Sequence, residues 1–470
     1  MLPLPRWTRP LLLIATAALA ACGGGGGGGG DGGTIIPGTC SATSQKQFVL
    51  DSAREWYLFP ELLPASINIA DYATAAELLD ALTSAARAQG RDRYFSYLTT
   101  PQEDSSFLQE GEYIGFGFRI QLQDGRLLVP EVYEASPADD GGMGRGVEIT
   151  AIDSGSGFVP MATILATDPD LEQALGPAST GVQRGLRYLR RDGQQVEVTL
   201  TKRVVTIQPL PATNGTRVFS LPGNPSVQVG YINLRTFIST AETPLRDAYS
   251  QFRTQGIDYF ILDLRYNGGG LLAIAELLGD LNGRDRLAAD IYANVRYNSR
   301  KSANDETRRF QPQPQSVNPV RIAFITTGLT ASASEMVVNS MKPWAEVAII
   351  GDDTYGKPVG QAAFDLAGCD LRLRLVTLKV TNALEQGDYY DGLAPTLPFA
   401  CAAGDDLSRG MGDPQESSTA AALSWLNLGA CGQVMGTPGA GLRALVAAPE
   451  AARTWPRPAT AAQAWLPGLF

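Results

Sequence analysis

The sequence predicts a layered α/β core, preceded by a helical segment and a small β-rich domain. Between residues 206 and 431, buried-looking strands alternate with amphipathic helices, which is typical of a layered α/β fold. Residues 111–205 carry short β-like runs separated by Gly, Asp and Pro turns. Residues 40–110 place apolar side chains three and four positions apart, which indicates helices. We therefore expect three folded units along the chain: the helical segment first, then the β-rich domain and then the α/β core.

The composition is that of a globular protein with an acidic balance. The 470 residues are 44% hydrophobic and 18% charged, and the formal net charge is −10. Phosphate binding needs clustered Lys and Arg, so this balance argues against a nucleic-acid partner. The chain contains no histidine. A Ser-His-Asp triad is therefore impossible for this chain acting alone.

Residues 1–21 have the character of a signal peptide. Two arginines precede the apolar stretch LLLIATAALAA, which is too short to span a bilayer as a stable helix. The stretch ends in Leu-Ala-Ala-Cys, which resembles the lipobox of bacterial lipoproteins. This resemblance implies cleavage before Cys22 and a lipid on its thiol, with an ordinary signal peptide as the alternative. Residues 22–39 would then be a lipidated, glycine-rich tether, and Gly23 favours the periplasmic side of the outer membrane.

The other cysteines are Cys40, Cys369, Cys401 and Cys431. An even number of cysteines in an exported chain predicts two disulfides, with three possible connectivities. Of these we favour Cys369–Cys401 together with Cys40–Cys431. A zinc site is the alternative, but the chain has neither histidine nor a C-x-x-C pair. We therefore expect no metal and no other cofactor.

The β-rich domain contains a glycine loop of a familiar kind. The stretch GFGFRI, followed by ASPADDGGMGRGVEITAID, resembles a PDZ domain of the type inserted in bacterial proteases. In such domains backbone N–H groups hold the C-terminal carboxylate of a peptide, which adds to the sheet as a further strand. The resemblance assigns this role to Gly115, Phe116, Gly117 and Phe118; a plain β-domain with a Gly turn is the alternative. Asp192-Gly193 predicts a hairpin in the same domain.

Within the core, TPLRDAYSQFRTQG predicts a helix capped by Thr243 and ended by Gly256. The runs YFILDLRY, VRIAFITT and EVAIIG predict buried strands, and LLAIAELLGDL and ASASEMVVNSM predict helices. The run CDLRLRLVTLKV alternates with period two, as a strand with one wet face does. Residues 432–470 are rich in Ala, Pro, Gly and Arg and are expected to be partly disordered.

Ser332, in TASASEM, is a candidate nucleophile at a helix start. A serine hydroxyl needs a base, and without histidine the remaining candidate is a lysine kept neutral by burial. Lys357 follows the strand EVAIIG, and a strand returning past the helix start would bring it near Ser332. The alternatives are a capping box formed by Ser332 and Glu335, and a surface position for Lys357.

The run DLRYNGGG places consecutive glycines after a buried strand. The backbone N–H groups of such a turn can hold an oxyanion. The N–H of Ala333, at the positive end of the next helix, would be a second donor. A tight turn without chemistry is the alternative.

Taken in order, these segments resemble the C-terminal-processing (tail-specific) peptidases, which are Ser/Lys-dyad serine endopeptidases. The resemblance implies a crotonase/ClpP-like layered core with Ser332 as nucleophile, Lys357 as base and Gln361 orienting the lysine. The oxyanion donors that it implies are Gly269, Gly270 and Ala333. It further implies substrates that are exported proteins with flexible apolar C-termini. A non-catalytic, lipid-anchored peptide-binding scaffold is the main alternative, and a crotonase-like acyl-CoA enzyme is a weaker one.

Overall fold

The computed structural model describes residues 40–436, 458 and 460–470. The predicted signal peptide, Cys22 and the tether lie outside the described residues. Within these described ranges, no helix combines the length and the apolar character needed to cross a bilayer.

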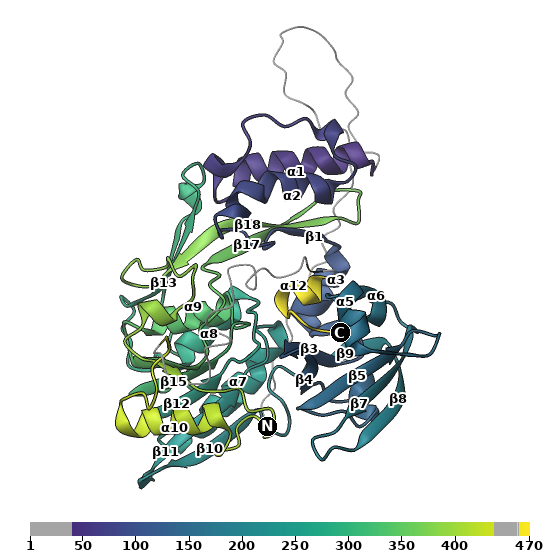
Figure 1. Ribbon diagram of the computed structural model, residues 1–470. Coiled ribbons are helices and arrows are strands. Elements are labelled where there is room, and N and C mark those ends of the chain that lie inside the picture. Colours follow the sequence, from purple (N-terminus) through teal and green to yellow (C-terminus); the bar gives the residue numbers. More distant parts are fainter. Residues whose placement is uncertain (1–39, 437–457, 459) are drawn as a thin grey trace, which may run out of the picture. The chain divides into compact units, whose positions relative to one another are not determined.

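A six-stranded sheet forms the centre of the core (Figure 1). Its first two strands are antiparallel, and the others run parallel to one another. In sheet order the strands are β10 (Thr216–Leu221), β11 (Asn224–Asn233), β12 (Tyr259–Asp263), β15 (Arg321–Thr326), β16 (Glu346–Gly351) and β19 (Ala400–Ala402). Three of these match the runs that the sequence predicted as buried strands.

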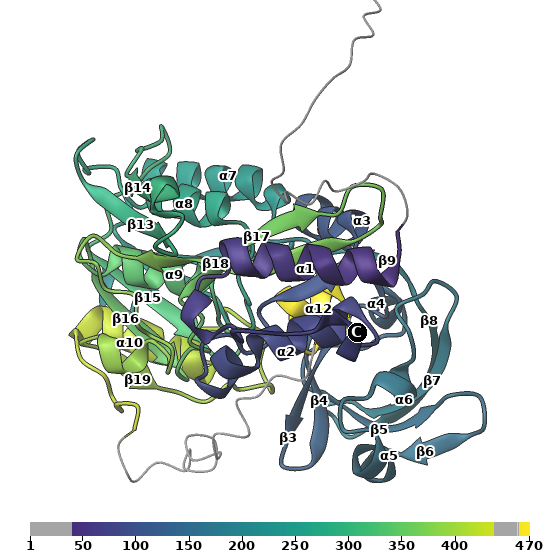
Figure 2. The ribbon, with the colours of Figure 1, turned by 90° about the horizontal axis from the view of Figure 1, so that it is seen from above.

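Helices cover both faces of this sheet, as the two-sided burial of parallel strands requires. Phe260 packs in one hydrophobic cluster with helices α7, α8 and α9, whereas its neighbour Ile261 packs in another with α10 (Figure 2). The helices are α7 (Glu242–Thr254), α8 (Leu272–Leu281), α9 (Ala333–Met341) and α10 (Ser417–Leu428). The predicted cap Thr243 is wrong by position: α7 begins at Glu242, directly after a 3₁₀ turn, η4 (Ser239–Ala241).

A second sheet lies beneath the N-terminal helices. Its strands are β1 (Tyr97–Thr99), β13 (Ile291–Tyr297), β14 (Glu306–Arg309), β17 (Val359–Asp365) and β18 (Arg372–Thr381). Helices α1 (Ala42–Trp56) and α2 (Ala75–Ala88) bury their apolar faces against β18, where Val49 and Leu78 share a cluster with Leu375 (Figure 1). The predicted helical segment therefore also supplies one strand, β1, to a sheet of the core.

The β-rich domain is built on a six-stranded antiparallel sheet, and the hairpin predicted at Asp192-Gly193 joins β7 to β8. The strands of this sheet are β3 (Phe118–Gln123), β4 (Arg126–Val132), β5 (Val147–Asp153), β6 (Phe158–Pro160), β7 (Gln183–Leu189) and β8 (Gln195–Thr201). A two-stranded ribbon accompanies it, β2 (Glu112–Gly115) with β9 (Arg203–Thr206). The short helices nearby are α3 (Pro101–Ser105), η3 (Ser106–Glu110), α4 (Pro137–Asp140), α5 (Met161–Thr167) and α6 (Glu172–Leu175).

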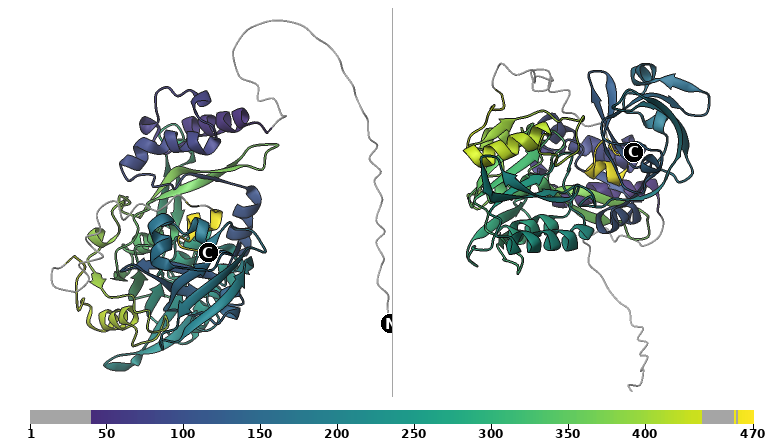
Figure 3. Two further views of the ribbon diagram at one scale, coloured as in Figure 1. Left: turned by 45° about the vertical axis from the view of Figure 1, so that its right-hand side comes forward. Right: turned by 90° about the horizontal axis from the view of Figure 1, so that it is seen from below.

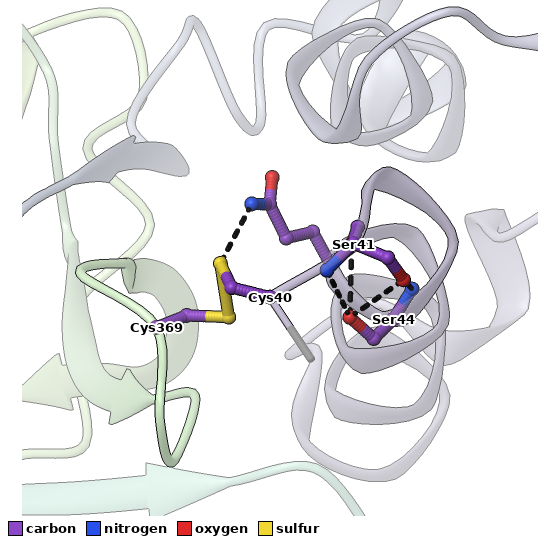
Figure 4. Close-up of a disulfide and its surroundings, with 5 residues drawn as sticks. Cys40, Ser41, Ser44 and Cys369 are labelled. Atoms are coloured by element: carbon purple, nitrogen blue, oxygen red, sulfur yellow. Dashed lines mark hydrogen bonds between the residues drawn. A yellow bond between two sulfur atoms is a disulfide. The ribbon is translucent and has the colours of Figure 1, made fainter. Parts of the chain in front are cut away.

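Two disulfides are present, but the favoured pairing was wrong. The bonds are Cys40–Cys369 and Cys401–Cys431, with Cα separations of 5.2 and 5.0 Å. Cys40 lies just before α1, which packs over β18, so its neighbour is the β17–β18 turn that carries Cys369 (Figure 4). Cys431 follows α10, where the chain returns beside β19 and Val434 bridges to Cys401. Both pairings follow from tertiary packing, which spacing along the chain does not reveal.

The C-terminal residues are folded against the rest of the chain. Helix α12 (Ala461–Trp465) is followed by a turn, and Leu469 then forms a β-bridge with Arg119, which brings Phe470 beside the β-rich domain (Figure 3). Ala462, Trp465, Leu466 and Leu469 are buried in a cluster that also contains Phe107. The expected disorder of the tail therefore does not extend to its last residues, and residues 437–457 and 459 lie outside the description.

Candidate active site

Ser332 stands at the N-cap of α9, where the sequence placed it. The residue is 8% exposed and therefore nearly enclosed. Its backbone has φ +57° and ψ −115°, a conformation that residues other than glycine rarely adopt. Strain of this kind is typical of a serine held at the tip of a sharp strand-to-helix turn.

Lys357 lies in the loop between β16 and β17 and is 4% exposed. Burial lowers the pKa of its ammonium group from 10.5 to about 8, although the charges of Asp92 and Glu335 oppose the shift. No hydrogen bond within the described chain involves Nζ, which lies 4.9 Å from the ring centre of Phe95 and 5.0 Å from that of Trp465. A lysine in such surroundings is partly neutral near pH 8 and can accept a proton.

The carboxylate of Glu335 joins the two backbone segments that carry these side chains. Its Oε2 accepts from the N–H of Ser332 at 2.9 Å and from the N–H of Lys357 at 2.8 Å. Its Oε1 accepts from the N–H of Gly356 at 2.7 Å. Desolvation raises the pKa of this buried carboxyl to about 7, against the effect of these hydrogen bonds. The capping pattern located Glu335, but the sequence did not indicate that its carboxylate also holds the lysine loop.

The N-terminal helical segment supplies one wall of the site, which the sequence did not indicate. Buried Asp92 accepts from the N–H of Phe95 at 2.8 Å and so holds that ring beside the lysine. Arg93 donates to the carbonyl of Gly356 at 2.6 Å, which secures the lysine loop. Gln361, on β17, donates from Nε2 to the carbonyl of Phe95 at 2.7 Å. The amide oxygen of Gln361 is then the group that remains to accept from an ammonium.

The glycine loop after β12 lies directly against the nucleophile candidate. A Cβ built on Gly269 would stand 2.8 Å from Cβ of Ser332 and 2.9 Å from the nitrogen of Ala333. The amide of Gly269 already donates to Oδ1 of Asn267 at 2.9 Å, so the donor role predicted for it was wrong. Among the described residues, the amides of Gly270 and Ala333 donate to no acceptor. These two amides are the remaining candidates for holding an oxyanion.

The predicted carboxylate-binding loop lies just before β3 and is occupied. The amides of Gly117 and Phe118 donate to a terminal carboxylate oxygen of Phe470 at 2.9 and 3.2 Å. A Cβ built on Gly115 would stand 2.9 Å from the carboxyl carbon of Phe470. The rings of Phe116 and Phe118 stack with centres 6.0 Å apart in the core of the domain. Two of the four predicted residues thus donate, and the other two shape the loop.

A single pocket joins the groups around Ser332, and it is lined by both the core and the C-terminal segment. Its lining residues are Leu108, Gly270, Leu271, Leu272, Ser332, Gly360, Gln361, Arg374 and Trp465. Trp465 was absent from the predicted site because nothing in the composition of the tail marks it. The pocket therefore combines the candidate nucleophile, the side-chain amide of Gln361 and one of the two candidate oxyanion donors, Gly270.

Two family models match the chain. The model described as "Peptidase family S41" matches residues 228–397, and the one described as "Peptidase S41 N-terminal domain" matches residues 44–97. The first range contains Ser332, Lys357 and Gln361, and the second ends just after Asp92 and Phe95. The matched segments thus contain the candidate dyad and the neighbouring Asp92 and Phe95, whereas Leu108 and Trp465 of the pocket lie outside both matches.

Curated relatives and a solved structure agree with these models. A carboxyl-terminal-processing protease of Synechocystis sp. is 28% identical over 59% of this chain, and chloroplastic carboxyl-terminal-processing peptidase 3 of Arabidopsis thaliana is 25% identical over 69%. Each alignment spans 61% of the relative's own length, which is less than two thirds. The crystal structure of a Bacteroides fragilis protein classed as an S41 protease shares the fold. Its TM-score is 0.63 at 23% identity, covering 81% of this chain and 97% of that one. Residues 44–97 and 228–397 therefore match peptidase family S41, and the chain is similar to carboxyl-terminal-processing peptidases in sequence and to an S41 protein in fold.

Proposed function

We propose that this chain is a serine endopeptidase that cleaves exported proteins with flexible, apolar C-termini. Ser332 is its nucleophile, Lys357 its general base and Gln361 the residue that orients the lysine. The observation that carries the proposal is the buried ammonium of Lys357, which has no hydrogen bond in the described chain. Glu335 accepts from the backbone N–H groups of both Lys357 and Ser332 and so ties their backbones together. The family's processing peptidases support the substrate class.

The reaction proceeds by acyl transfer to Ser332. Neutral Lys357 takes the hydroxyl proton as the oxygen attacks the carbonyl carbon of the scissile bond. The amides of Gly270 and Ala333 stabilise the tetrahedral oxyanion, a contribution of roughly 3 kcal/mol per donor. The lysine ammonium then gives its proton to the leaving amine, and water hydrolyses the acyl-enzyme by the same route. Apart from the substrate and water, each step is assigned to a group of this chain.

The β-rich domain would be a PDZ-type peptide-binding domain that holds the C-terminus of the substrate. What supports this is the pair of amides at Gly117 and Phe118, both of which donate to a carboxylate. A peptide added beside β3 would gain backbone hydrogen bonds as a further strand. Such binding would place an unfolded tail near the active-site pocket.

The test of the dyad is substitution of the full-length protein, purified in detergent. Cleavage of an unfolded reporter with an apolar C-terminus is followed by mass spectrometry. Ser332→Ala and Lys357→Ala should each lower kcat/KM on the order of 10⁴-fold or more. Lys357→Arg should be equally inactive, because a guanidinium does not lose its proton at working pH.

Lys202→Ala is the matched control for the lysine variants. Lys202 is also buried with a pKa lowered to about 8, but it lies in the β-rich domain and donates to the carbonyls of Gly176 and Pro177. Its loss should leave cleavage of a short internal peptide unchanged. Full activity of Lys357→Ala would refute the dyad. Reporter binding without cleavage by the unaltered protein would favour the scaffold alternative.

We further propose that the protein is exported and held by a lipid on Cys22 at the periplasmic face of the outer membrane. The support is the lipobox-like Leu-Ala-Ala-Cys alone, and Cys22 lies outside the described residues. Incorporation of a labelled fatty acid that is lost in Cys22→Ser would bear the proposal out. Equal labelling of both proteins, or labelling of neither, would reject it.

A further inference from the structure

The C-terminus of the chain occupies the carboxylate-binding loop of its own β-rich domain. One carboxylate oxygen of Phe470 accepts from the amides of Gly117 and Phe118. The N–H of Phe470 donates to the carbonyl of Phe118 at 3.0 Å, and Gly468 accepts from the N–H of Ile120 at 2.8 Å. The segment is thus antiparallel to β3, as a bound peptide strand would be.

The side chains of this segment are bound as well as its backbone. Phe470 packs against the core cluster that contains Phe116 and Phe118. Leu466 and Leu469 are 0% and 2% exposed. The carboxylate and the ring of Phe470 therefore each have a binding site in the β-rich domain. The buried side chains of Leu466 and Leu469 add apolar contacts.

The residue at the start of the same segment covers the catalytic groups. Trp465 lines the pocket that contains Ser332, and its ring centre lies 5.0 Å from Nζ of Lys357. Its carbonyl oxygen lies so close to the glycine loop that a Cβ built on Gly268 would stand 1.9 Å from it. The guanidinium carbon of Arg374 lies 6.0 Å from the centre of the same ring. One short segment thus occupies the peptide site and the active site together.

We propose that residues 465–470 are an intramolecular inhibitor. A peptide that ends in the same chemical groups as this segment would compete for the loop and release it. The releasing ligand is a peptide with a free C-terminal carboxylate on a large apolar residue, Phe by preference, preceded by an apolar residue. When such a peptide takes the loop, the tail leaves β3 and Trp465 leaves the pocket. The effect on turnover rests on the proposed peptidase function, whereas the recognition of the tail does not.

The tail competes effectively because it is part of the same chain. A tethered ligand acts at an effective concentration on the order of millimolar. A free peptide with the same end can bind only the molecules whose loop is empty. Its apparent affinity is therefore its intrinsic affinity multiplied by the fraction of such molecules. Substrates whose C-terminus displaces residues 465–470 would therefore raise the activity, whereas other polypeptides would leave the active-site pocket covered.

The first experiment measures recognition without catalysis, using the full-length protein with Ser332→Ala. A fluorescein-labelled peptide ending in Leu-Pro-Gly-Leu-Phe is titrated with a free carboxylate and with a C-terminal amide. Phe470→Asp, which puts a charge into the apolar site, should bind the free-acid peptide about tenfold or more tightly than the parent does. Phe470→Leu is the matched control and should behave as the parent.

Three results of this titration would overturn the recognition of the tail. These are equal affinity of parent and Phe470→Asp, equal affinity for acid and amide, and no binding by either protein. Melting curves recorded beside the titrations show whether Phe470→Asp is folded. Should it be unfolded, release of the parent's own tail is instead followed by hydrogen exchange at Phe118 and Ile120 with added free-acid peptide, and unchanged protection would contradict the proposal.

The second experiment measures inhibition, through the rate at which a fluorophosphonate probe labels Ser332. Phe470→Asp and Trp465→Ala should each label about tenfold faster than the parent, and the free-acid peptide should accelerate the parent alone. Equal rates would overturn the inhibitory role. If no protein is labelled while the titration succeeds, the peptidase function and the inhibition fail together, and recognition of the tail stands.

Discussion

Two glycine loops of this molecule each have a buried lysine beside them, and one of the loops holds a carboxylate. One loop, at Gly268–Gly270, lies against Ser332 with Lys357 nearby. The other, at Gly115–Phe118, holds a carboxylate, with Lys202 5.0 Å from the ring centre of Phe116. Burial lowers the pKa of both lysines to about 8. The two sites are built from the same parts.

The hydrogen bonds of the lysines separate the two functions. The ammonium of Lys202 donates to the carbonyls of Gly176 and Pro177 at 2.6 and 3.0 Å, so it is fixed as a structural cation. Within the described chain, that of Lys357 donates no hydrogen bond and lies 4.9 and 5.0 Å from the ring centres of Phe95 and Trp465. A lowered pKa therefore marks burial in both places, and only the lysine without acceptors can take up a proton from a neighbour.

The largest difference between the two loops should appear when a methyl group is added to the loop beside Ser332, because catalysis should fall while peptide binding does not change. Gly270 has φ +137°, and a Cβ there would stand 2.2 Å from the carbonyl oxygen of Phe237. Gly270→Ala should displace its amide and lower kcat roughly 10²–10³-fold, with binding of the free-acid peptide unchanged. Gly256→Ala, also at positive φ but with open space around it, is the control. Parallel loss of peptide binding would show general damage instead.

The same change in the carboxylate-binding loop should weaken peptide binding more than it changes the reactivity of Ser332. Gly117 has φ +90°, and a Cβ there would stand 2.0 Å from Cβ of Ser136. Gly117→Ala should weaken the free-acid peptide about 10- to 100-fold, because it disturbs two hydrogen bonds to a charged group. Labelling of Ser332 should not slow down. Gly125→Ala, in the open β3–β4 turn, should bind normally, and if Gly117→Ala did too, the loop would have no role in recognition.

The pH dependence should belong to Lys357 alone. The general base must be neutral, so its active fraction grows as pH rises through its pKa of about 8. Between about pH 7 and about pH 9, kcat/KM should rise about tenfold. Lys202→Met should keep the same midpoint, measured with a short internal peptide. A shifted midpoint in Lys202→Met would mean that the wrong lysine has been assigned.

The smallest effect should be on stability. The folded pKa of Glu335 is about 7, above the reference value of 4.5. The stabilisation from this group is therefore complete below about pH 4.5 and is lost as pH rises through 7. Glu335→Gln should flatten the fall of Tm across this window by about 2 °C, as scanning calorimetry would measure. Glu197→Gln, on the half-exposed Glu197 of β8, should leave the slope unaltered.

Local patterns predicted the parts of this molecule that depend on local physics. The capping pattern placed Ser332 at a helix start, and strand periodicity located β12, β15 and β16. Parallel strands end at one edge of a sheet, which brings Gly270, Ser332 and Lys357 together.

What the sequence did not predict depends on contacts between distant segments. The cysteine pairing follows from where α1 lies, and the wall at Asp92 and Phe95 from how the helical segment packs. The loss of Gly269 as a donor arises from one bond, to Asn267. The tail was judged by its composition, whereas its last residues are ordered by a site more than 300 positions earlier in the chain.

The end of this polypeptide is also a practical matter for anyone who produces the protein. The carboxylate of Phe470 is a ligand, so a purification tag fused after it would replace that charge with a peptide bond. Preparations tagged at the two ends would then differ in their resting state, and activities compared between them would describe two different molecules.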